Sequence, residues 1–241
     1  MHAVVTILCR ELGAYLRTPM GYIIMAAVLC VDGLLFNAFA VGAEARPSTQ
    51  ALEIFFYCTS GPTLIACIFI AMRLIAEERQ SGSWVLLATA PLRDWQIVAG
   101  KFTAAWLYMA LLTALTVPMP ALIFLHGKVA WGHIAAGYLG LLLLSSAALA
   151  LGMLCSALAA NQLVAAILSA AVVTTFILLW RLAAIASPPL EQMLAYLSLH
   201  DRHFRPFMRG LIGTADLVFY LSLTYLALVA TTRALEARRW R

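Results

Sequence analysis

Long apolar runs separated by short polar segments dominate the pattern along this chain. A helix needs about 20 apolar residues to cross the roughly 30 Å hydrocarbon core of a bilayer, because each residue adds about 1.5 Å. Pro118 and Pro120 should kink the third run or end it early, and Pro62 should kink the second. The pattern predicts an all-α membrane protein with six transmembrane helices in one domain, residues 1–241. The six predicted spans are residues 22–41, 52–75, 95–125, 133–159, 163–186 and 214–232.

Residues 1–19 follow a different pattern. Apolar residues between Val4 and Leu16 recur at helical spacing, while Arg10 and Arg17 lie away from the densest apolar face. This pattern predicts an interfacial helix that lies along the membrane surface. Because these charges stand where a signal peptide needs an uninterrupted apolar core, we do not expect a cleavable signal peptide.

Composition and charge add an orientation. The chain is 63% hydrophobic and only 11% charged, whereas a typical soluble domain has about 25% charged residues. Of its 16 Lys and Arg residues, ten fall on the side that carries both predicted termini and six on the other. The positive-inside rule therefore predicts that both termini are cytoplasmic. The net charge of +5 comes without a basic stripe interleaved with aromatic residues, so nucleic acid is not an expected partner.

The polar hairpin at residues 76–94, between the second and third spans, contains a short apolar segment of its own. The second span is expected to continue through "RLIAEERQ" until the pair "SG" breaks it. Ser83 can then cap a short helix, "WVLLATA", which Pro91 ends, and Asp94 can cap the third span. An apolar helix in a polar hairpin needs a partner surface that shields its apolar face from water. A groove on a soluble protein and the lipid headgroups both provide it, and the residues alone leave the two open.

The stretch "RLIAEERQSGSWVLLATAPLRDWQIVAGKF" resembles the signature hairpin of type 2 ABC transporter permeases. The N-terminal "RELGAYLRTPMGYI" and the late "LSLHDRHFRPFMRGLIGTADLVFYLSLTYLALVATTRALEARRW" are similar to the gliding-motility branch of that family. Ser83 stands where the family usually has Thr, and Val85 where it often has an acidic residue. The residues that match the hairpin pattern are Glu77, Glu78, Arg79, Gly82, Leu86, Leu87, Thr89, Pro91, Ile97, Gly100 and Lys101.

The resemblance implies a permease subunit that forms half of the pathway of an ATP-driven exporter in a bacterial inner membrane. A second permease copy or a paralogue would complete the pathway, two ABC ATPase subunits would grip the hairpins, and a periplasmic auxiliary subunit is a further expected partner. ATP and Mg²⁺ would bind the ATPase, since this chain lacks GxxxxGK[ST] and is expected to hold no cofactor. The alternative is a membrane anchor that recruits an ABC ATPase to a motility or maturation machine without moving a solute. The residues expected to couple to the ATPase are Glu78, Trp84, Leu86, Leu87, Thr89 and Pro91.

An enzyme is the rival class, but HExxH, GxSxG and Ser-x-x-Lys motifs are absent, so we expect no catalytic residues. Asp32 falls near the middle of the first span, where a charge costs about 2.5–3.5 kcal/mol, so it should face the helix bundle or be neutral. With Asn37 it forms a candidate intramembrane polar site. Its role is open between substrate or proton contact and simple hydrogen bonding to another span.

The segment 187–213, between the fifth and sixth spans, is expected on the extracytoplasmic side. A helix can begin after Pro189, with an apolar face that would cover the outer mouth of the pathway. His200 and His203 in "HDRHF" lack a third and fourth ligand nearby in sequence. We therefore expect a solvated polar turn rather than a metal site. That apolar face consists of Leu190, Met193, Leu194 and Leu197.

Overall fold

The computed structural model describes residues 2–41, 47–82, 92–126, 129–188 and 190–239, and every regular element in these ranges is a helix. No strand occurs among them. The elements are α1 (His2–Arg17), α2 (Pro19–Leu35), η1 (Phe36–Val41), α3 (Ser48–Ala71), α4 (Ala76–Gln80), α6 (Asp94–Leu115), α7 (Pro118–His126), α8 (Trp131–Leu158), α9 (Gln162–Ala183), α10 (Leu190–Leu197), α11 (Phe204–Met208) and α12 (Thr214–Arg239).

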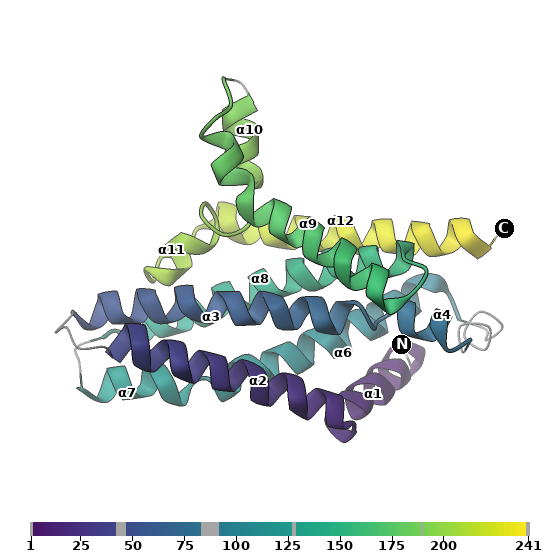
Figure 1. Ribbon diagram of the computed structural model, residues 1–241, viewed down its shortest axis with the longest axis horizontal. Helices are drawn as coiled ribbons and strands as arrows, with labels where there is room; N and C mark the ends of the chain where they lie inside the picture. Colours follow the sequence, from purple (N-terminus) through teal and green to yellow (C-terminus); the bar gives the residue numbers. More distant parts are fainter. Residues whose placement is uncertain (1, 42–46, 83–91, 127–128, 189, 240–241) are drawn as a thin grey trace.

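Six helical segments among the described residues are long and apolar enough to cross a membrane, as the sequence predicted. They run side by side along the longest axis of the molecule, and both marked chain ends lie at the same end of the bundle (Figure 1). We call this the terminal end, and it also carries α1 and α4. The opposite end carries α7 and α11 (Figure 1).

Helix α8 forms the centre of the bundle and contacts α3, α6, α9, α11 and α12. Small residues allow this close packing. A Cβ atom added at Gly137 would overlap the Phe56 ring, and one at Gly152 would overlap the Ala71 side chain, both on α3. Gly137 and Gly152 therefore belong to the surface by which α8 packs against α3.

The break at Pro118 is confirmed, because α6 ends at Leu115 and α7 begins at Pro118. The second span reaches Gln80 as expected, but it is not one unbroken helix. Helix α3 ends at Ala71, and a turn precedes the short α4. The backbone amides of Ile75, at the end of this turn, and Ala76, at the start of α4, donate to Ser156 of α8. The predicted end after "RLIAEERQ" is correct: Gly82 follows α4 with a φ of 74°, which glycine adopts at little cost. Asp94 is the first residue of α6 rather than its cap.

The segment between α9 and α12 forms a helix after Pro189, as predicted, but α10 projects away from the bundle instead of covering its end (Figure 1). None of the residues of α10 is buried. The unpredicted α11 packs on α8 and α3, with Phe204 and Phe207 fully buried. At this end of the bundle α11 rather than α10 therefore packs against the membrane helices.

Candidate coupling site

The stem, residues 72–82, leads from the membrane helix α3 into the polar hairpin and is held by helix α8. The Ser156 hydroxyl accepts hydrogen bonds from the backbone amides of Ile75 (3.2 Å) and Ala76 (3.0 Å) and lies 3.2 Å from the Met72 carbonyl, to which it donates. These are the amides that a continuous helix would have bonded internally, so Ser156 stabilises the break between α3 and α4.

Further along the stem, Arg79 donates to the carbonyl oxygens of Ala157 (2.6 Å) and Ala159 (3.2 Å). These carbonyls belong to the C-terminal end of α8, where unpaired acceptors and the helix dipole favour a cation. Gln80 accepts from the backbone amide of Gln162 at the start of α9. The stem is thus attached to two helices other than its own.

An ionic cluster of Arg10, Glu11, Glu78 and Lys101 joins the stem to α1 and α6. Lys101 Nζ lies 2.8 Å from Glu78 Oε1 and 3.1 Å from Glu11 Oε1. Arg10 contacts the same two carboxylate oxygens, at 3.2 Å and 2.6 Å. Two cations and two anions therefore form one neutral group shared by three elements.

The cluster is partly removed from water. The Lys101 side chain is only 2% exposed, and the carboxylates of Glu11 and Glu78 are 15% and 12% exposed. A buried ammonium is tolerated when it is paired and hydrogen-bonded, which both carboxylates achieve here. Burial would raise the pKa of the Glu11 carboxyl, but the charges and hydrogen bonds of Lys101 and Arg10 outweigh it and lower that pKa below its usual range.

Helix α1 reaches the cluster by packing along α6. Ile7 of α1 is buried there, and a Cβ atom added at Gly100 would lie 2.9 Å from Ile7. Glycine at this position brings the two helices close enough for the neighbouring Lys101 to meet Glu11. The arrangement supplies mechanical connection rather than bond chemistry. The described residues contain no group of three or more His, Cys, Asp or Glu that could hold a metal ion.

The family follows from a comparison with protein-family models: the ABC-2 family transporter protein model matches residues 13–236. The chain belongs to the ABC-2 transporter family. It is a multi-pass membrane protein and the membrane component of an ABC transporter, a type 2 ABC permease. The comparison with curated proteins gives no match.

Of the predicted coupling residues of the permease, Glu78 is the one that lies within the described part of the chain. Glu78 lies in the ionic cluster, with its carboxylate turned toward Lys101. Its partners Glu11 and Lys101 were missed as site residues, although Lys101 is an isolated charge in an apolar stretch, which is a usable signal. The remaining predicted coupling residues, Trp84, Leu86, Leu87, Thr89 and Pro91, lie outside the described residues.

The two residues of the predicted intramembrane site differ in burial. Asp32 on α2 is buried, 1% exposed, and faces the bundle as predicted. Neither of its carboxylate oxygens has a hydrogen-bond partner among the described residues. Asn37 on η1 is exposed. The two side chains therefore occupy different environments and do not form a common site in this chain.

The solvated turn expected at "HDRHF" was wrong, because both histidines are buried. Nε2 of His200 lies 2.9 Å from the Ser60 hydroxyl on α3. Nδ1 of His203 lies 2.7 Å from a carboxylate oxygen of Asp216, and its Nε2 lies 2.8 Å from the Tyr196 carbonyl. The imidazole rings offer two polar atoms each at defined angles, so they tie this segment to α3 and α12 from within the protein. Burial lowers the pKa of His200.

Proposed function

We propose that this permease couples ATP hydrolysis on a separate ABC ATPase to export across a bacterial inner membrane. The observation that carries the proposal is the attachment of the stem to α1, α6 and α8 by the ionic cluster and Ser156. Residues 83–91 directly follow the stem in sequence. A displacement imposed on them by an ATPase would therefore act on three membrane-associated helices together.

The remaining parts of the proposal come from the family and the charge pattern. Two permease subunits, identical or paralogous, would form the pathway, and two ATPase subunits would bind ATP and Mg²⁺. The basic residues favour cytoplasmic termini, which puts the terminal end of the bundle on the side where ATP is available. The N-terminal and late motifs support the gliding-motility branch.

The test is purification of the tagged permease in a mild detergent, with identification of co-purifying proteins by mass spectrometry. We expect a stoichiometric ABC ATPase that is lost on Leu87→Asp, because a carboxylate in an apolar docking face is costly to bury. Leu190→Asp is the matched control, since Leu190 is 57% exposed on α10, and it should retain the ATPase.

A permease that purifies without an ATPase would contradict the proposal. Equal retention by both variants would contradict the role assigned to Leu87. Reconstitution into vesicles then separates export from anchoring: ATP-dependent transport supports the exporter, whereas a stable complex that hydrolyses ATP and moves nothing supports the anchor.

A further inference from the structure

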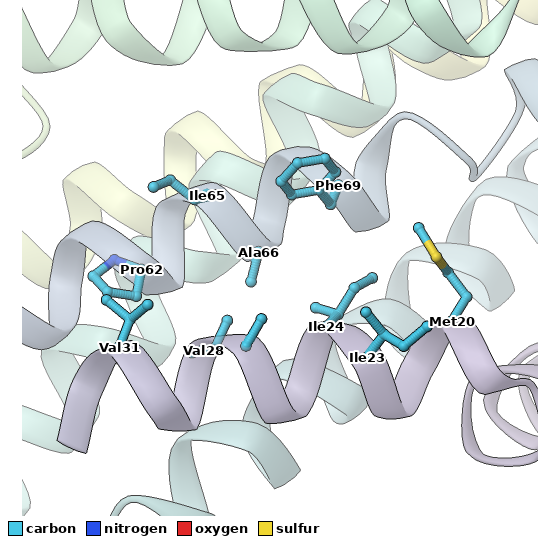
Figure 2. A pocket seen from close by; sticks show the side chains of 10 residues that line it. Met20, Ile23, Ile24, Val28, Val31, Pro62, Ile65, Ala66 and Phe69 are labelled. Atoms are coloured by element: carbon cyan, nitrogen blue, oxygen red, sulfur yellow. The ribbon is translucent and has the colours of Figure 1, made fainter. Parts of the chain in front are cut away.

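An apolar groove runs between α2 and α3 on the surface of the bundle (Figure 2). Its volume is about 280 Å³, and Val28 and Val31 of α2 face Pro62 and Ala66 of α3 across it. Every lining residue is apolar. It follows α2 from the terminal end toward the middle of the bundle.

The groove continues into a larger pocket of about 890 Å³, which shares Val31, Pro62 and Ile65 with it. This pocket has apolar walls from α2, α3 and α9, and Arg181, His200 and Asp201 line it as well. A third pocket of about 360 Å³ shares Tyr57, His200 and Asp201 with the second and adds Glu53 and Arg205. Lining polarity thus increases along one path, from the apolar groove to the polar pockets.

The length of the apolar part suits a hydrocarbon chain. From Met20 to Leu35 the path follows α2 for about 22 Å at 1.5 Å per residue. One bilayer leaflet has a hydrocarbon depth of roughly 15 Å, so an extended acyl chain can lie along the groove. The 890 Å³ pocket lies in the range typical of small-molecule sites, about 300–1,000 Å³.

The charges at the polar end favour an anionic head. No described carboxylate forms an ion pair with Arg181 or Arg205, whereas Glu53 is paired with Arg209 at 3.0 Å. Asp201 is the remaining acidic group there, which leaves two guanidinium groups against one carboxylate. Guanidinium groups bind carboxylate and phosphate oxygens through two parallel hydrogen bonds.

We propose that this path binds a membrane amphiphile with one hydrocarbon chain along α2 and α3 and a carboxylate or phosphate head at Arg181 and Arg205. The proposal deepens the proposed function by naming the class of cargo, and it rests on that function for the statement that the amphiphile is exported. Binding itself can be measured without the ATPase.

Two native cysteines report on the path. Cys58 lines the larger pocket, whereas Cys30 is exposed on α2 and lines none of the three pockets. The permease is placed in nanodiscs of neutral phosphatidylcholine and labelled with N-ethylmaleimide, and each cysteine is quantified by peptide mass spectrometry. We expect saturating palmitate to slow labelling of Cys58 about fivefold or more, the effect of roughly 80% occupancy, and to leave Cys30 unchanged.

A matched pair of variants tests the groove. Ala27 lines it, while its neighbour Ala26 is also exposed on α2 but does not. We expect Ala27→Phe to abolish the protection of Cys58 by palmitate and Ala26→Phe to preserve it. Equal protection in both variants would overturn the placement of the chain.

Probe heads test the polar end. Palmitate and palmitoyl lysophosphatidate should both protect Cys58, and hexadecyltrimethylammonium, with a chain of the same length, should protect it at least tenfold less well. Arg181→Gln should reduce this preference, whereas Arg202→Gln, outside the pockets, should keep it. Protection by all three probes alike would overturn the anionic head. A Cys58 that is unreactive before any probe is added would overturn the proposal, because the larger pocket would then not be open to a ligand.

The two proposals can fail separately. Protection of Cys58 in a permease that purifies without an ATPase supports amphiphile binding and contradicts the exporter. Retention of the ATPase with no protection of Cys58 supports coupling and contradicts the amphiphile.

Discussion

Replacement of Lys101 by methionine removes the central cation of the ionic cluster while keeping a side chain of similar length and apolar character. Glu11 and Glu78 would then face each other and Arg10, with one of the two compensating cations lost. The expected result is a large loss of stability at the junction of α1, the stem and α6.

The magnitude follows from the two distances to Lys101 Nζ, 2.8 Å and 3.1 Å. At an effective dielectric constant of about 20, each pair attracts by roughly 5–6 kcal/mol. Desolvation of the ammonium offsets much of this attraction, and the net cost of removing one partner of a buried pair is about 3–5 kcal/mol. For a chain of this length, each kcal/mol lowers the melting temperature by about 2–4 °C, so a decrease of about 6–20 °C is expected.

The assay is thermal unfolding in a mild detergent, followed by the loss of the monodisperse peak in size-exclusion chromatography. Arg233→Met is the control, because Arg233 pairs with Glu236 at 2.9 Å but its side chain is 77% exposed. A surface pair of this kind contributes about 0–1 kcal/mol. In the Lys101→Met background, Glu78→Gln should restore part of the stability by removing one uncompensated charge.

The reasoning would be refuted by a decrease for Lys101→Met no larger than that of the control. It would also be refuted by additive effects of the Lys101 and Glu78 changes, since groups that interact at 2.8 Å must be energetically coupled.

Four further changes test other parts of the structure. The pKa of Glu11 is lowered in the folded protein, so its contribution to stability is present above the ordinary carboxyl pKa of about 4.3 and is lost as the pH falls through the folded pKa. Glu11→Gln should therefore make the melting temperature less dependent on pH between about pH 5 and pH 3. Burial lowers the pKa of His200, so stability should decrease as the pH falls below about 6.5, and His200→Gln should remove that decrease in the same measurement. Gly152→Ala should destabilise by about 1–3 kcal/mol because its Cβ overlaps α3, whereas Gly61→Ala, with nothing within 4 Å of its Cβ, should gain about 0.5–1 kcal/mol. Asp32→Asn should leave the melting temperature unchanged or raise it, because the carboxylate has no hydrogen-bond partner among the described residues; a decrease of several degrees would show that the acid is paired.

The spans could be predicted because their cause is local. The length and apolarity of a run determine whether a helix can cross a bilayer, and Pro118 acts on its own segment. The break after Ala71 has no comparable local signal. It depends on Ser156, which lies more than eighty residues later and supplies the acceptor for the turn.

The same distinction separates the parts of the candidate site. Glu78 and Lys101 both stand in the recognisable hairpin motif, whereas Glu11 joins them only because α1 packs against α6. The two histidines were misjudged for a related reason. A polar stretch predicts exposure, but partners on α3 and α12 allow both imidazoles to be buried.

The central position of α8 has a consequence for how such a protein can diversify. Of the residues in the most apolar stretch of each span, 83% are buried within the protein in α8, compared with 17% in the first span and 22% in α9. Substitutions on the first span and α9 therefore meet few packing constraints within this chain, while α8 tolerates little change. Both sparsely packed helices line the larger pocket. Relatives can accordingly change the shape and charge of this pocket by substitutions in the first span and α9, while α8, which anchors the stem, stays the same.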